Sequence, residues 1–122
     1  MIEPREGGQV RFNEGHIRGV VTQWRPPRKF AHTWNVFSGE EEESAYPQSC
    51  VGFELSARGE AVELILFHLP VLERFEAQNQ MGWHTMLDIL EAAVRGQPPE
   101  SRQAYMRANA ARYGVDLGNL TR

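Results

Sequence analysis

Histidines offer the widest range of chemistry in this sequence, because imidazole titrates near neutral pH and binds transition metals. His32 and His68 lie on the apolar sides of two alternating segments, and His84 lies in a segment of helical periodicity. Three imidazoles could ligate zinc or copper, but no closely spaced ligand pair accompanies them and no carboxylate shares their strand faces. We therefore predict no metal and no cofactor, and interpret His32 and His68 as hydrogen-bonding groups of a pocket wall.

Groups suited to catalysis are few. His84 and Asp88 are four residues apart, so a helix would bring them together like a base and its orienting carboxylate, although a surface pair is the commoner meaning of this spacing. The nucleophile motif Gly-x-Ser-x-Gly is absent, and alternation places Cys50 on the face opposite the apolar one. His68 alone could act as an acid or base in an isomerisation or cyclisation. The sequence favours a protein without enzymatic activity, and we assign no catalytic residue.

Alternating apolar residues, separated by turn residues, predict five β-strands over about residues 8–69. The prolines of the turn Arg25-Pro26-Pro27-Arg28 lack amide donors and separate the second strand from the third. Arg58-Gly59-Glu60 has the composition of a hairpin turn. The predicted strands are Gly8–Phe12, Gly15–Trp24, Lys29–Val36, Ser49–Ser56 and Ala61–Leu69, the last with Val62, Leu64, Leu66 and His68 on its apolar face.

A period of 3.6 residues then replaces the period of two and predicts a long helix over Val71–Arg95. Pro70 suits a first helical turn, and Gly96-Gln97-Pro98-Pro99 marks the end of the helix. A weaker helical extension is predicted over about residues 99–114. The long helix carries an apolar stripe that requires a partner, formed by Trp83, Met86, Leu87, Leu90, Ala93 and Val94.

Antiparallel strands followed by one long amphipathic helix predict an α+β fold, in which the helix covers the apolar face of a curved sheet. The space between them would form a concave apolar pocket that binds a ligand rather than transforming it. Trp34 and Trp83 could be walls on which a planar ligand stacks, although tryptophan in such positions more often belongs to the core. The predicted ligand-binding residues are Phe30, His32, Trp34, Phe53, Leu64, Leu66, His68, Trp83, Met86, Leu87 and Leu90.

The composition is that of a single globular domain over residues 1–122, with 41% hydrophobic and 24% charged residues. No apolar run is long enough to cross a bilayer. The net charge of −3 gives no attraction to phosphate backbones, so we expect no nucleic-acid partner. One cysteine excludes an internal disulfide and fits a cytoplasmic protein. Two charged segments could meet a protein partner: Glu40–Glu43, expected to be a solvated loop, and the turn with Arg25, Arg28 and Lys29.

Four sequence blocks resemble, in order and spacing, the START-like SRPBCC superfamily, and most closely its branch homologous to the carboxyl-terminal domain of the activator of the 90-kDa heat-shock chaperone ATPase. A Pro-Pro-Arg turn before a strand that ends in Thr-Trp is the most specific element. The resemblance covers about residues 7–95 and implies a helix-grip fold, as in START domains and birch-pollen allergens. The blocks are Gly19–Val21 continuing through Trp24–Trp34, Ser49–Leu55, Leu64–His68 and Gly82–Leu87.

The resemblance also implies a departure at the amino terminus. Members of the family begin with a strand and two short helices before the segment that corresponds to Gly7–Phe12, and this sequence begins almost at that point. In the family the first strand pairs with the final one, so we expect an unpaired edge along Ala61–Leu69. Either a second subunit covers this edge, which makes the protein a homodimer, or the first residue is an internal methionine.

The function implied by the resemblance is broad, because the superfamily includes lipid carriers, cyclases and proteins that bind aromatic ligands. We expect non-covalent binding of a hydrophobic small molecule, which is lipid, aromatic or polyketide-like, in the pocket between sheet and helix. The alternative is a protein-interaction module that regulates a chaperone ATPase. The third hypothesis is a cyclase or isomerase that uses His68.

Overall fold

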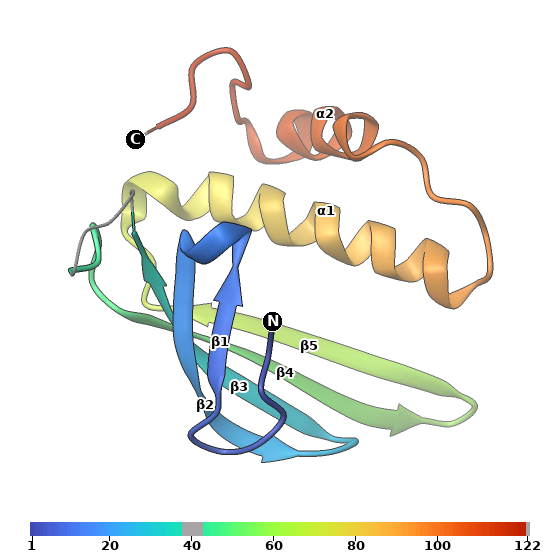
Figure 1. Cartoon of the computed structure of the whole chain (residues 1–122). Helices are drawn as coiled ribbons and strands as arrows, with labels where there is room; N and C mark the ends of the chain where they lie inside the picture. Colours follow the sequence, from blue (N-terminus) through green and yellow to red (C-terminus); the bar gives the residue numbers. More distant parts are fainter. Residues whose placement is uncertain (38–42, 122) are drawn as a thin grey trace. The chain divides into compact units, whose positions relative to one another are not determined.

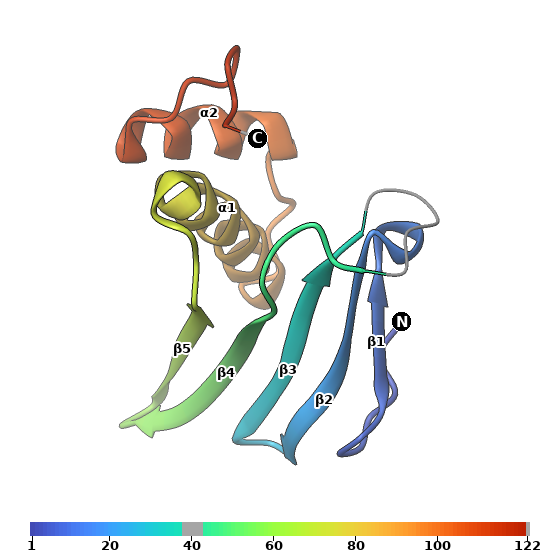
Figure 2. The ribbon, with the colours of Figure 1, turned by 90° about the vertical axis from the view of Figure 1, so that its left-hand side faces the viewer.

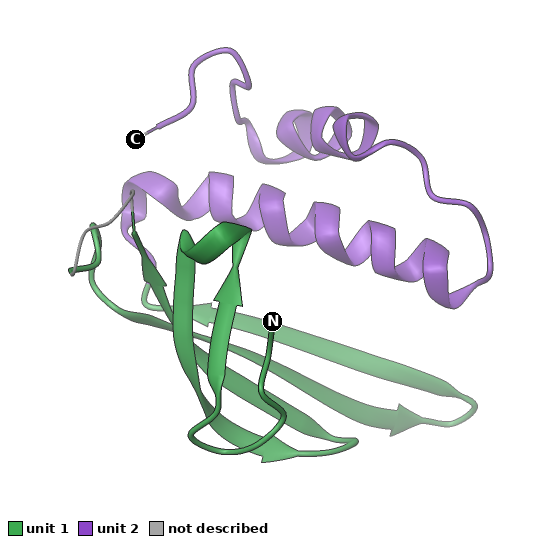
Figure 3. Cartoon of the chain, viewed as in Figure 1, with its two compact units in different colours: residues 1–70 green, residues 71–122 purple. Residues whose placement is uncertain are grey.

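The computed structural model describes residues 1–37 and 43–121. It contains two compact units, Met1–Pro70 and Val71–Arg122, drawn in green and purple in Figure 3. The first unit contains the strands and the second contains the α-helices, as the change of periodicity predicts. Most of the predicted acidic loop, Glu40–Glu43, lies outside the described residues.

The first unit is built on a five-stranded antiparallel sheet, in which each strand pairs with its neighbours along the chain. Figures 1 and 2 show the strands side by side in the order β1-β2-β3-β4-β5, with a clear curvature of the sheet. Among the described residues, β5 pairs only with β4, so it forms one edge of the sheet. The strands are β1 (Gln9–Phe12), β2 (Ile17–Arg25), β3 (Lys29–Val36), β4 (Ser49–Arg58) and β5 (Ala61–Leu69).

The five predicted strands are confirmed, with small differences at their ends. β2 begins at Ile17 rather than Gly15, because Asn13–Gly15 forms a 3₁₀ turn whose three residues have φ angles of 49°, 57° and 89°. β4 continues past its predicted end to Arg58, and Gly59 then reverses the chain with a φ angle of 63°. Residues 26–28 form the predicted turn between β2 and β3.

A β-bulge in β2 changes which side chains share a face. Val21 lies opposite His32, whereas Gln23 lies opposite Ala31, so one extra residue is inserted into β2 between the two pairs. Simple alternation from Val21 would place Trp24 on the opposite face of the sheet. The bulge restores Trp24 to the same face as His32, because an inserted residue shifts the alternation by one position.

β2 and β3 approach each other closely just before this bulge. A Cβ atom at Gly19 would overlap the carbonyl oxygen of Thr33, so the missing side chain is what permits the approach. The regular pairing is interrupted here, and the amide of Val20 donates to the side-chain Oγ1 of Thr33 at 2.8 Å. Gly19 therefore permits the close approach of β2 and β3.

The opposite face of the sheet has its own close contact, between β4 and β5. Gly52 and Phe67 are register partners, and the ring of Phe67 occupies the space that a Cβ at Gly52 would enter. Gly52 is buried and Phe67 is half-buried. The aromatic ring thus fills the volume that the missing side chain leaves on β4.

The second unit contains a 3₁₀ turn, η2 (Glu73–Phe75), and two α-helices, α1 (Glu76–Val94) and α2 (Arg102–Tyr113). The prediction of a helix that starts at Val71 with Pro70 in its first turn is wrong. Leu72 has extended backbone angles, with φ −61° and ψ 135°, and therefore interrupts any helix before η2. Among the described residues, no helix is both long and apolar enough to cross a membrane.

The other helix ends follow from glycine and capping residues. Gly96 has a φ angle of 69° just after α1, and the amide of Gln97 donates to the carbonyl of Ala92, which closes the last turn. α2 begins later than predicted, because the hydroxyl of Ser101 accepts a hydrogen bond from the amide of Ala104 and caps the helix. Gly114 ends α2 with left-handed angles, φ 69° and ψ 33°.

Alanine substitutions at Gly19 and Gly82 form a matched pair of variants. We expect Gly19→Ala to lower the free energy of unfolding by about 2 kcal/mol or more, because the new methyl group would force β2 and β3 apart. We expect Gly82→Ala to raise the free energy of unfolding by up to about 1 kcal/mol, because alanine is favoured inside a helix and an added Cβ would meet no described atom within 4 Å apart from the chain neighbours and backbone of its own helix. Urea denaturation of both variants measures the two changes; equal stability of Gly19→Ala and wild type would contradict the close approach.

Candidate ligand-binding site

One face of the sheet carries a row of rings along β3. Phe30, His32 and Trp34 alternate along this strand, so their side chains project to the same side. The ring centroids of Phe30 and His32 are 5.3 Å apart, and those of His32 and Trp34 are 6.1 Å apart. Trp24, brought to this face by the bulge, meets Phe30 edge-on at 5.5 Å.

Rings from three other strands, β4, β5 and β1, lie beside this row. Phe53 of β4 lies opposite Phe30 in the register and stacks on it at 5.9 Å with an interplanar angle of 9°. The ring of His68 on β5 is 5.2 Å from that of Trp34. The ring of Phe12 on β1 is 6.0 Å from that of His32. We call the set the aromatic face; it consists of Phe12, Trp24, Phe30, His32, Trp34, Phe53 and His68.

His32 is the most buried member of the aromatic face, with 2% of its surface exposed. Its Nδ1 lies 2.8 Å from the carbonyl oxygen of Thr33, which can only accept, so Nδ1 carries the proton in the neutral ring. Burial lowers the pKa of His32 from its ordinary value, an effect that the hydrogen bond to Thr33 partly opposes. The ring is therefore neutral at pH 7, and its Nε2 is a hydrogen-bond acceptor.

His68 forms a short hydrogen bond with a buried hydroxyl group. Its Nε2 lies 2.7 Å from Oγ of Ser49, which is 7% exposed and also lies 3.5 Å from the carbonyl oxygen of Trp34. A hydroxyl and an imidazole at this distance have the separation of a nucleophile and its base. The same bond also has a structural role, because it gives a hydrogen-bond partner to each of two polar groups that lie among aromatic rings. This structural role requires no third residue.

The structure brings together all seven sheet residues of the predicted ligand-binding set. Leu64 lies opposite Leu55 and Leu66 lies opposite Phe53, so both belong to the same side of the sheet as the five ring residues. Cys50 lies on the other side, as predicted, because its register partner is Thr33.

Sequence reasoning missed three residues of this face, Phe12, Trp24 and Ser49. The signals for two of them were present. Phe12 is two residues from the buried Val10 in the first predicted strand, and Ser49 alternates with Val51 and Phe53. Trp24 gives no such signal, because its neighbours on the sheet depend on the bulge, which has no signature in the alternation.

The other four predicted ligand-binding residues belong to α1, in the second unit. By a period of 3.6 residues, Trp83, Leu87 and Leu90 lie on the side of α1 opposite the buried Thr85, which contacts α2, and Met86 lies beside them. Met86 is 48% exposed and Leu90 is 47% exposed. The predicted apolar stripe is thus distinct from the side of α1 that packs against α2.

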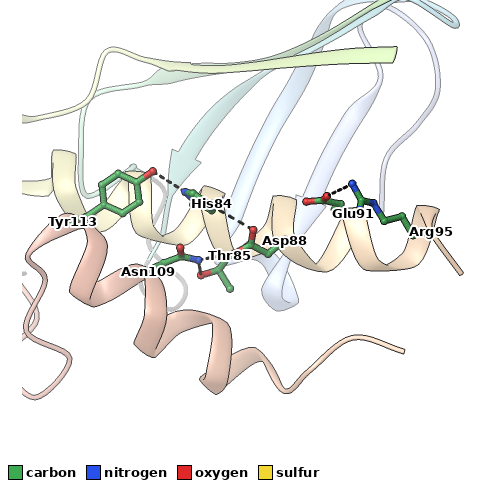
Figure 4. Close-up of polar contacts among 7 residues, drawn as sticks. All are labelled: His84, Thr85, Asp88, Glu91, Arg95, Asn109 and Tyr113. Atoms are coloured by element: carbon green, nitrogen blue, oxygen red, sulfur yellow. Dashed lines mark hydrogen bonds and ion pairs between the residues drawn. The ribbon is translucent and has the colours of Figure 1, made fainter. Parts of the chain in front are cut away.

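A chain of polar contacts joins α1 to α2, as Figure 4 shows. Nδ1 of His84 lies 2.8 Å from the hydroxyl of Tyr113, and its Nε2 lies 3.5 Å from Asp88. Asn109, 1% exposed, donates to Asp88 at 2.9 Å and to Thr85 at 3.1 Å.

These contacts correct the interpretation of His84 and Asp88 as a surface pair. Their side chains are only 30% and 29% exposed, because α2 covers the pair and supplies hydrogen-bond partners to both. The pair therefore serves to hold the two helices together, and its carboxylate is shared with Asn109 rather than dedicated to orienting a base. Among the described residues, no group of three or more histidine, cysteine or acidic side chains could hold a metal ion.

Comparison with known proteins gives one family and a small number of solved structures. The model of the family "Activator of Hsp90 ATPase homolog 1-like protein" matches residues 1–95. No curated protein matches the chain.

Two solved proteins share the fold. The crystal structure of CalU16 from Micromonospora echinospora is 26% identical, with a TM-score of 0.70, and the match covers 93% of this chain and 66% of that one. The solution structure of the protein encoded by gene BPP1335 from Bordetella parapertussis is 28% identical, with a TM-score of 0.60, and the match covers 82% of this chain and 51% of that one. The chain thus spans less than two thirds of either protein. It has the predicted α+β fold of the SRPBCC, or helix-grip, type.

The burial of His32 predicts a loss of stability in acid. Because its pKa is lowered in the folded protein, the unfolded chain takes up a proton first as the pH falls below the ordinary value of 6.5. The free energy of unfolding should therefore be highest above pH 6.5 and should decrease below it, with a slope that one group limits to about 1.4 kcal/mol per pH unit.

Urea denaturation between pH 7.5 and 5 measures this slope in wild type and in His32→Gln, in which it should be smaller. His16→Gln, which removes an exposed histidine, is the matched control for the loss of one imidazole. An identical pH profile for wild type and His32→Gln would show that His32 does not titrate differently in the two states.

Proposed function

Because the chain belongs to the family of Activator of Hsp90 ATPase homolog 1-like proteins, we propose that it binds a hydrophobic small molecule without forming a covalent bond, at the aromatic face of its sheet. The observation that carries this proposal is the concentration of rings from β1 to β5 on one side of the sheet. Aromatic rings offer large apolar surfaces on which a planar or extended apolar ligand can lie.

Polar groups within the aromatic face would set the orientation of such a ligand. Nε2 of His32 is an acceptor, and the hydrogen-bonded pair of Ser49 and His68 adds a hydroxyl and an imidazole near Trp34. A few polar groups among many apolar ones are typical of small-molecule sites. We therefore expect a ligand with an apolar ring or chain and at least one hydroxyl or carbonyl group.

Residues of α1 belong to the same proposal. The helix-grip fold and the apolar stripe on α1 support the assignment of Trp83, Met86, Leu87 and Leu90 to this binding site. These residues lie away from the α2 side of the helix, so a role in ligand binding does not compete with helix packing within the second unit.

A ligand panel tests the proposal, with Trp34→Ala as the main variant. Lipids, flavonoids and polyketides are added to the wild-type protein, and the melting temperature is measured; a ligand at 100 times its Kd should stabilise the protein by about 2.7 kcal/mol. We expect Trp34→Ala to weaken the best ligand at least tenfold, because it removes the ring that joins β3 to His68.

The matched control is Ile65→Ala, which truncates an exposed apolar side chain on the opposite face of the sheet and should leave the affinity unchanged once folding is verified by circular dichroism. The proposal fails if no compound of the panel raises the melting temperature of the wild type. Recovery of the bound compound with an altered chromatographic retention time would instead identify an isomerase or cyclase, and His68→Gln would then have to abolish the conversion.

The family match supports a second candidate function, regulation of a chaperone ATPase. The matched region, residues 1–95, contains the whole sheet and α1. This candidate predicts that the purified protein increases the ATPase rate of a 90-kDa heat-shock chaperone several-fold, and that Trp34→Ala retains the increase if the partner binds elsewhere. An unchanged rate at saturating protein would remove this candidate and leave the ligand-binding proposal intact.

A further inference from the structure

The first unit has an open hollow at the end of the sheet where β2 turns into β3. Its volume is about 810 Å³, and it lies beside the turn and the last residues of β4. None of the rings of the aromatic face lines it, so it is a separate feature. The residues that carry its chemistry are Arg25, Arg28, Lys29, Glu54, Leu55 and Val62.

The positive charges of this hollow are only partly neutralised. Nζ of Lys29 lies 2.9 Å from a carboxylate oxygen of Glu54, so these two charges compensate each other. Arg25 and Arg28 are exposed and have no ion pair among the described residues. Two uncompensated guanidinium groups thus lie together on a chain whose net charge is −3.

Apolar side chains lie beside these charges. Leu55 is 41% exposed and Val62 is 68% exposed. The register pairs Ala57 with Val62, and Leu55 is two residues from Ala57, so both apolar side chains lie on one side of the β4–β5 hairpin. Adjacent exposed apolar groups rimmed by charge are typical of protein-interaction sites.

We propose that this hollow binds an acidic peptide segment of another protein, in which carboxylates alternate with apolar side chains. Arginine pairs with carboxylates through two parallel hydrogen bonds, so Arg25 and Arg28 would each take one acidic side chain. Leu55 and Val62 would contact an apolar side chain between them. This inference goes beyond the proposed ligand-binding function and involves different residues.

The surroundings favour a peptide over other anions. Most residues around the hollow are exposed, whereas small-molecule sites enclose most of their ligand. A nucleic acid would gain little from Leu55 and Val62, because its backbone offers no apolar side chain to contact them. An extended peptide, which keeps one side in water and offers both charge and apolar groups, matches this lining.

Fluorescence anisotropy with a labelled peptide of alternating glutamate and leucine tests the proposal. We expect the peptide to bind wild-type protein and to lose at least tenfold in affinity in the double variant Arg25→Gln/Arg28→Gln. The control Arg102→Gln/Arg107→Gln removes the same charge from exposed positions of α2 and should bind as wild type does. Raising the salt concentration should weaken wild type more than the Arg25→Gln/Arg28→Gln variant.

Two further probes separate the parts of the proposal. A peptide of alternating glutamate and serine should bind at least tenfold more weakly, and Leu55→Ser/Val62→Ser should abolish the difference between the two peptides. The proposal is overturned if the first peptide does not bind, if both arginine variants bind it equally, or if a single-stranded oligonucleotide binds as tightly. Melting shifts with the apolar panel, measured on Arg25→Gln/Arg28→Gln, report on the ligand-binding proposal independently.

Discussion

The pairing register of β3 is the constraint on which the candidate site depends. Six consecutive residue pairs join β3 to β4, from Lys29 with Glu54 to Trp34 with Ser49. Because side chains alternate along a strand, a slip of one residue would turn His32 and its two ring neighbours to the other side of the sheet. The ring contacts between β3 and β4 and the burial of the His32 imidazole therefore depend on this alignment.

Much of this arrangement could be predicted from the sequence, because sheet alternation is a local property. Phe30, His32 and Trp34 are two residues apart, and Pro26 and Pro27 mark the turn before their strand. The same logic correctly placed Cys50 on the opposite face. It could not place Trp24, because a bulge inserts a residue without any change in the pattern of apolar side chains.

Contacts between segments that are distant in the chain could not be predicted from the sequence. His84 and Tyr113 are 29 residues apart, and no periodicity relates them, so the covered position of His84 required the structure. The hydrogen bonds of Asn109 could not be predicted either. The sequence of α2 is that of a weakly apolar helix, which would be expected to pack through its alanine and tyrosine side chains. The helix pair instead depends on polar groups that must satisfy one another away from water.

The contact of Phe67 with Gly52 determines how β5 can align with β4. Moving β5 along β4 by two residues would keep every side chain on its proper face, so alternation by itself does not forbid that shift. The ring would then meet Cys50 or Glu54, whose side chains already occupy the corresponding space, while the gap over Gly52 would stay empty. A single aromatic residue on the back of the sheet thus selects one alignment among those that the front would tolerate, and thereby fixes how far His68 lies along its strand from Ser49.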